Sequence, residues 1–146
     1  MSIMAWEPVV EKSPLMWQPG AMSPALNDLR QRRDQLGASY VTEDDLVRWS
    51  DIKGRFVELF DRLAVEIATL YHARQADFAF CDDVINEIYW IMADSPANEK
   101  EHYCSEKLEK VYHAFDDGEW HRRKDQSDDP VAEHTNPAIA AIIAEL

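Results

Sequence analysis

Apolar residues recur every three or four positions over much of the chain, which is the spacing of one helix face. The least interrupted stripe lies behind Thr42, a residue type that favours the N-cap position and is followed here by three acids in the first turn. This pattern predicts one long helix over about residues 43–74. The members of the stripe are Trp49, Ile52, Phe56, Leu59, Leu63, Ile67 and Leu70.

A helix of about 32 residues would span roughly 48 Å, at about 1.5 Å per residue. That length exceeds the diameter of a compact domain of this size. We therefore expect that one end projects, that two chains pair through it as a homodimer, or that the helix kinks near Gly54.

Two further helices are predicted from their end signals. Ser23-Pro24 is typical of an N-cap followed by a first helical residue, and Gly37 is a typical stop. Another helix is expected from near Asp77 to the residue before Ser95. The residues expected on its inner face are Phe78, Cys81, Val84, Ile85, Ile88, Ile91 and Met92.

The C-terminal third carries two more apolar stripes. One helix is expected from around Asn98 until Asp116-Asp117-Gly118 stops it, and a short connection should make it antiparallel to the helix before it. Its inner face is expected to contain Cys104, Leu108, Val111 and Phe115. A last short helix is expected to be capped at Asn136, with Ile139, Ile142, Ile143 and Leu146 as its apolar stripe.

These elements predict an all-α fold, a four- to five-helix bundle. Residues 1–22 contain prolines and tryptophans without a helical or alternating period, so they are expected to form an irregular N-terminal arm. The arm packs either on its own domain or on a partner. Residues 23–146 are expected to form a single helical domain, and a chain of 146 residues is long enough to bury one core.

The formal net charge is −13, which limits the class of partner. Residues 1–41, 42–100 and 101–146 carry net charges of 0, −7 and −6, so the acids are spread over most of the chain. Such a field opposes direct binding of nucleic acid or of a membrane surface and favours a basic protein. Simple solubility is the alternative explanation. Neither a basic, apolar leader nor a long apolar run occurs, so a cytoplasmic protein is expected.

No motif for catalysis is convincing. The four glycines stand alone, which argues against a phosphate-binding loop, and no serine has the flanking glycines of a nucleophile elbow. The pair Glu99 and His102 has the spacing of a di-iron ligand pair but occurs once, and Cys81 and Cys104 lie too far apart for a metal half-site. We therefore expect no enzyme activity, no cofactor, no metal site and no catalytic residues.

The polar segment from Asp116 to Pro137 is the strongest candidate for binding. It is predicted to be a long acidic loop that surrounds one large aromatic side chain. Acids steer a basic partner toward the loop, and a tryptophan is a frequent anchor in interfaces. The expected partner-binding residues are Asp116, Asp117, Glu119, Trp120, Asp125, Asp128 and Asp129.

In size, acidity and helical content the chain resembles bacterial immunity proteins and other small inhibitors. The likeness of composition implies a protein that neutralises a basic partner such as a bacterial toxin. An inhibitor that mimics nucleic acid, as phages encode, is one alternative, and a metal-dependent helical enzyme or a subunit of an oligomeric enzyme is another. A further alternative is that the partner binds a helix face around Asp82, Asp83 and Glu87.

Overall fold

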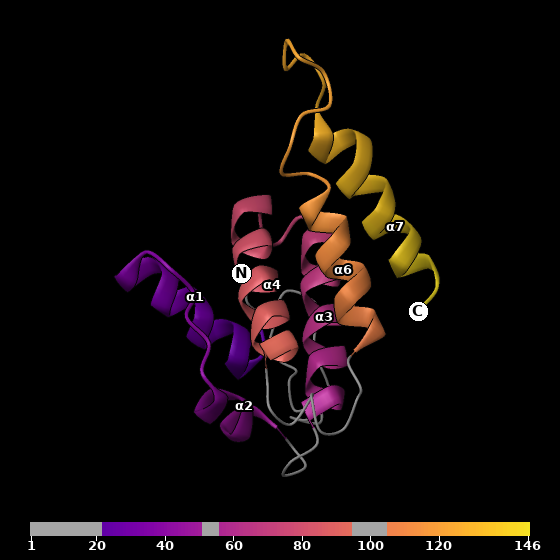
Figure 1. Cartoon of the computed structure of the whole chain (residues 1–146). Helices are drawn as coiled ribbons and strands as arrows, with labels where there is room; N and C mark the ends of the chain where they lie inside the picture. The colour runs from indigo at the N-terminus through magenta and orange to yellow at the C-terminus, as the bar shows by residue number, and fades with distance from the viewer. Residues whose placement is uncertain (1–21, 51–55, 95–104) are drawn as a thin grey trace, which may run out of the picture.

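The computed structural model describes residues 22–50, 56–94 and 105–146, and over these ranges the chain is all-α, as the sequence predicts. Figure 1 shows α3, α4 and α6 side by side, with α7 beyond α6 and with α1 and α2 on the other side, next to α4. No helix in these ranges is long and apolar enough to cross a membrane. The elements are α1 (Pro24–Leu36), α2 (Glu43–Trp49), α3 (Phe56–His72), α4 (Phe78–Asp94), α6 (Glu106–Asp116), the π-helical turn η1 (Val131–Thr135) and α7 (Asn136–Ala144).

The core lies between α3, α4 and α6, and α7 covers α3 and α6. The inner faces are those that the apolar stripes predict, because Cys81, Ile85, Ile88, Leu108 and Val111 are all buried. Burial raises the pKa of the Cys81 thiol to about 12, so this cysteine is a protonated core residue. The other cysteine lies outside the described residues.

Helices α4 and α6 are antiparallel neighbours, as predicted. The sulfur of Met92, near the end of α4, accepts a hydrogen bond from the backbone N–H of Ser105, at the start of α6, at 3.3 Å. Further along both helices, Tyr89 stacks on Tyr112 with 3.8 Å between ring centroids. The residue numbers of the contacts fall along α4 while they rise along α6, which fixes the register of the pair.

The ends of α1 confirm the capping signals. The Ser23 hydroxyl accepts a hydrogen bond from the Leu26 N–H at 3.3 Å, and Gly37 ends the helix with φ +83°, a conformation that glycine adopts without strain. A tertiary contact adds to this cap, since the backbone N–H of Ser23 donates to the buried carboxylate of Glu66 on α3 at 2.6 Å. The N-terminus of α1 is therefore anchored on α3.

The single helix predicted over residues 43–74 is wrong. Helix α2 ends at Trp49, because Ser50 has the extended angles φ −80° and ψ 136°, and α3 begins at Phe56. The Trp49 indole N–H donates to Asp28 on α1 at 3.1 Å, so the end of α2 packs toward α1 and does not continue into α3. The kink expected at Gly54 lies outside the described residues. The length argument for a projecting helix or a homodimer through it no longer applies.

Two other predicted boundaries also change. Ser105 has φ −80° and ψ 116° and caps the Leu108 N–H at 3.0 Å, so α6 begins at Glu106 and no helix continues into it from Asn98. The C-terminal helical segment begins at η1, before Asn136. Asn136 itself has helical angles, and the carboxylate that caps the segment is Asp129, which accepts from the Ala132 N–H at 3.2 Å.

A buried carboxylate joins α1 to α2. Arg32 on α1 donates to both oxygens of Asp45, at 2.6 and 2.9 Å, and the backbone N–H of Thr42 donates to the same side chain at 2.9 Å. Arg48 donates to it as well. The hydrogen bonds from Arg32 hold the pKa of Asp45 well below its usual range. This ion pair links α1 to α2.

We expect Asp45→Asn to lower the free energy of unfolding by about 1–3 kcal/mol at neutral pH, because two arginines lose a charged acceptor. Since the pKa of Asp45 is lowered in the folded state, its contribution is complete above about pH 4 and is lost as the pH falls below that value. Urea unfolding of both proteins should therefore show a difference that shrinks in acid. The exposed neighbour Asp44 supplies the control, and Asp44→Asn should change stability by less than about 0.5 kcal/mol.

Candidate protein-binding site

The loop that joins α6 to η1, residues 117–130, is folded around a carboxylate. Asp128 accepts hydrogen bonds from the backbone N–H of Arg122 at 2.8 Å and lies 3.1 Å from Nδ1 of His121. The Arg122 N–H, with the hydrogen bond from His121, lowers the pKa of Asp128 to about 2. Its side chain is only 2% exposed. Asp128 was predicted to face a partner, but the structure turns it inward, where it holds the loop together.

Two further acids of the loop make local hydrogen bonds. Asp125, near the tip, accepts from the backbone N–H of Ser127 at 3.1 Å, and Asp129 accepts from the Ala132 N–H at 3.2 Å. Both remain exposed to solvent. Their charges therefore stay on the surface, although their positions are set by a turn and by a helix cap.

Trp120 is the exposed aromatic of the loop, with 51% of its surface accessible. The guanidinium of Arg122 lies over its ring, 3.7 Å from the centroid. Arg122 also donates to the backbone oxygens of Asp117, at 2.7 Å, and of Trp120, at 2.9 Å. The cation–π contact favours this orientation of the indole and so lowers the entropy that is lost when a partner binds it.

Glu119 and Asp116 meet an acid from another helix. The side-chain amide of Asn86 on α4 donates to Oε2 of Glu119 and to Oδ1 of Asp82, each at 3.2 Å. Burial, then the hydrogen bond and charge of Glu119, then the charges of Asp116 and Asp83, raise the pKa of Asp82 to about 8. We call Asp82, Asp116 and Glu119 the carboxyl cluster.

The carboxyl cluster contains residues of both binding surfaces that the sequence analysis treated as alternatives, the loop and the helix face. Asp82 belongs to the proposed helix face, and Glu119 belongs to the loop. Within the described ranges, no lysine or arginine is ion-paired with any member of the cluster. Glu87, the other end of the proposed helix face, is hydrogen-bonded with the backbone of Val41 and so lies toward the α1–α2 connection.

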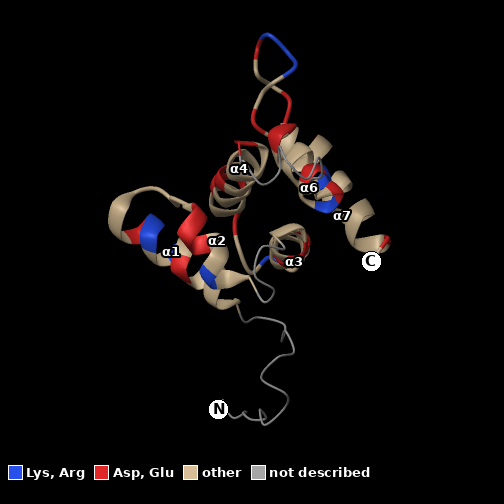
Figure 2. Ribbon diagram, turned by 60° about the horizontal axis from the view of Figure 1, so that its bottom comes forward, with Lys and Arg blue, Asp and Glu red and all other residues tan. Residues whose placement is uncertain are grey.

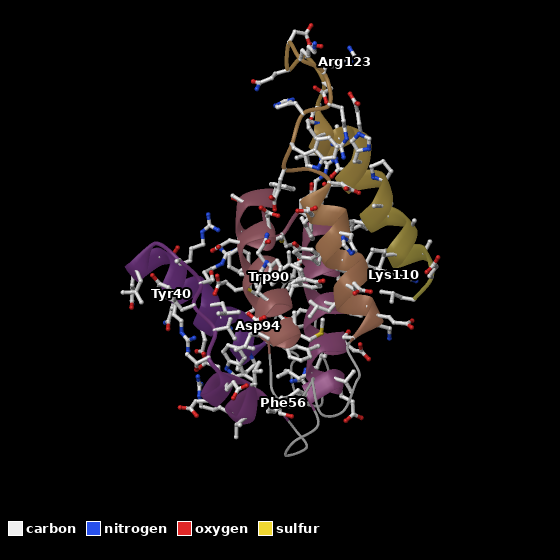
Figure 3. The ribbon with its side chains drawn as sticks, in the orientation of Figure 1. Tyr40, Phe56, Trp90, Asp94, Lys110 and Arg123 are labelled. Atoms are coloured by element: carbon white, nitrogen blue, oxygen red, sulfur yellow. The ribbon has the colours of Figure 1, made fainter. Side chains whose placement is uncertain are left out.

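Charge is divided along the loop. In Figure 2 the base of the loop, where it leaves α6, is red, and its tip is blue with a red stretch beside it. The basic tip contains Arg122, Arg123 and Lys124, all exposed. Figure 3 shows Arg123 at this tip, far from the body of the helices. The negative part of the site is therefore at the base of the loop, beside the start of α4.

An aromatic strip lies below the carboxyl cluster, and sequence analysis did not single it out. Tyr89 and Tyr112 stack with 8° between their planes, and the ring of Trp90 stands at 83° to Tyr89 and at 84° to Tyr112. Trp90 is 53% exposed. The sequence did contain a signal for this surface, because Trp90 falls outside the inner apolar stripe of α4. A large aromatic residue on an outer helix face has no role in the core and can indicate a binding surface.

Among the described residues, no group of three or more histidine, cysteine, aspartate or glutamate side chains is placed to hold a metal ion. The pair Glu99 and His102 lies outside the described ranges. No protein-family model and no curated protein matches the sequence, and no solved structure matches the fold.

We expect Asp82→Asn to flatten the pH dependence of stability. The folded-state pKa of Asp82 is raised, so its contribution is present in acid and is lost as the pH rises from about 4 to about 8. Unfolding measured across this range should show the variant gaining about 1–2 kcal/mol relative to the parent at the alkaline end, after screening by solvent. Asp44→Asn should leave the profile of the parent unchanged. A parallel profile for Asp82→Asn would contradict the raised pKa.

We expect Gly118→Ala to destabilise the base of the loop. A Cβ atom at this position would lie 2.2 Å from Oγ1 of Thr135 and 3.0 Å from the ring of Phe78. Thr135 cannot easily move, because it is buried and donates to the backbone oxygen of Ala114 at 2.7 Å. The expected loss is about 1–3 kcal/mol in thermal or urea unfolding. Lys124→Ala at the exposed tip should be neutral, and equal stability of the two variants would refute the close approach.

Proposed function

We propose that the protein binds a basic protein partner through the carboxyl cluster and Trp120, in the manner of an inhibitor or immunity protein that neutralises a toxin. The observation that supports this most directly is the carboxyl cluster itself. Three carboxyl groups meet at a half-buried site, where their proximity raises the pKa of Asp82, and no lysine or arginine among the described residues is paired with them. A lysine or arginine of a partner would supply the missing countercharge.

Trp120 gives the surface its apolar anchor. It lies directly after Glu119, so one partner side chain can contact the indole while a neighbouring one pairs with the carboxylate. Large aromatic side chains that are already ordered lose little entropy on binding. Arg122 would be displaced from the ring or would remain on its other face as the partner docks.

The basic tip weighs against mimicry of nucleic acid. A phosphate mimic needs acids in long uninterrupted rows, whereas three consecutive basic residues begin at Arg122, separated by only two residues from the last acid of the loop base. The same tip would meet acids of a protein partner. Protein binding therefore accounts for both halves of the loop.

The test is kinetic. A partner is first captured from native lysate on the immobilised full chain, and its binding is then followed by surface plasmon resonance. Trp120→Ala should speed dissociation by about tenfold or more, because an anchor is lost from the bound state. Glu119→Lys should slow association and reduce its dependence on salt, because acids steer the encounter.

A matched variant on α2 controls for net charge. Glu43→Lys changes the total charge as Glu119→Lys does, but on a remote exposed turn. It should leave the association rate within about twofold of the parent. If Glu43→Lys and Glu119→Lys slow association equally, and Trp120→Ala has no effect, the site does not lie on the loop.

A further inference from the structure

The aromatic strip continues the proposed site along the seam between α4 and α6. On α4, Asp82, Asn86 and Tyr89 occupy successive turns of one face, and on α6 Tyr112 precedes Asp116 by one turn. Because the two tyrosines are in contact, the aromatic strip lies next to the carboxyl cluster along the α4–α6 seam. Figure 3 shows Trp90 on α4, below the loop.

The strip lies in the field of the acids. Burial raises the pKa of Tyr112, and the negative charges of Asp116, Glu119 and Asp82 raise it further. The electron-rich faces of aromatic rings and nearby carboxylates both attract cations. Trp90 stands nearly at right angles to the stacked tyrosines and is more than half exposed, so the strip forms an aromatic corner on the surface.

We propose that Trp90, with Tyr89 and Tyr112, is a second anchor of the interface and binds an arginine side chain of the basic partner. This inference rests on the proposed function. A planar guanidinium can lie flat on an indole while its N–H groups donate to carboxylates, and Asp116 lies one turn beyond Tyr112 on α6. The ammonium group of lysine is compact and strongly hydrated, and it satisfies this geometry less well. The ligand of the strip is therefore a protein segment with exposed arginine.

The experiment uses the full ¹⁵N-labelled chain with two probes of equal charge, a nona-arginine and a nona-lysine peptide. The indole N–H signals of the tryptophans report each site separately in a titration followed by NMR. Nona-arginine should shift the Trp90 signal and bind more tightly than nona-lysine. Trp90→Ala should weaken nona-arginine binding by about 5- to 30-fold and nona-lysine binding by no more than about twofold.

Two variants separate the cation–π contact from other effects. Trp90→Leu keeps an apolar side chain on the surface without the aromatic face, and it should lose the preference for arginine as Trp90→Ala does. Val47→Ala removes another exposed apolar side chain, 54% accessible on α2, and should leave both affinities within about twofold. Retained preference in Trp90→Leu, or an equal loss in Val47→Ala, would overturn the proposal.

The outcomes also distinguish this inference from the proposed function. If nona-arginine shifts only the Trp120 signal, and only Trp120→Ala weakens binding, the loop site stands and the second anchor is wrong. If only the Trp90 signal and variant respond, the loop is not the main anchor and the strip is supported. If both peptides shift signals evenly over the acidic surface and neither tryptophan variant matters, both proposals fail.

Discussion

The register between α4 and α6 is the constraint on which the surface of this protein depends. It is set by fully buried apolar side chains, with Ile85 and Ile88 on one helix and Leu108 on the other. Because each inner face is fixed in the core, each outer face is fixed too. The same register that buries these residues brings Asp82 to Glu119 and Tyr89 to Tyr112. Packing thus positions the candidate site although the site itself contributes little to the core.

The acids of this chain have two different physical consequences. Asp45 and Asp128 receive several hydrogen bonds, their pKa values are lowered, and they stabilise the fold at neutral pH. Asp82 has acids as its charged neighbours and a raised pKa, so it weakens the fold as it ionises. Net charge alone cannot separate these groups. The distinction matters for function, because a carboxylate that already has its donors gains less from a cation of a partner.

Local signals in the sequence predicted local structure well. Ser23, Gly37 and Thr42 cap or end helices as their residue types favour, and the inner faces of α4 and α6 follow the apolar period. The long helix failed for a different reason. The extended backbone of Ser50 ends α2, but the three- to four-residue spacing of apolar residues in the sequence continues unchanged across this position. Apolar spacing alone therefore cannot reveal that the helix is interrupted there.

The candidate site was predictable only in part. Glu119 and Trp120 are exposed as expected, but Asp128 is buried because the loop folds back on itself, and no local signal marks an acid that accepts from the backbone within its own loop. The meeting of Asp82 with Glu119 depends on tertiary packing between residues far apart in the chain. The sequence indicated that Trp90 lies on an outer face of α4. Its contact with Tyr112 on α6, however, could be found only from the structure.

The loop combines a fixed base with a charged tip, and this arrangement affects what binding would cost. Asp128 ties two backbone segments of the loop together, and Arg122 holds the indole of Trp120. An ordered loop pays little conformational entropy when a partner docks. The carboxyl cluster raises the pKa of Asp82 before binding, and a cation from the partner would favour the ionised form of this side chain. Affinity in such a site would come from new contacts between the partner's cation and the carboxylates, reduced by the free energy needed to remove the proton from Asp82.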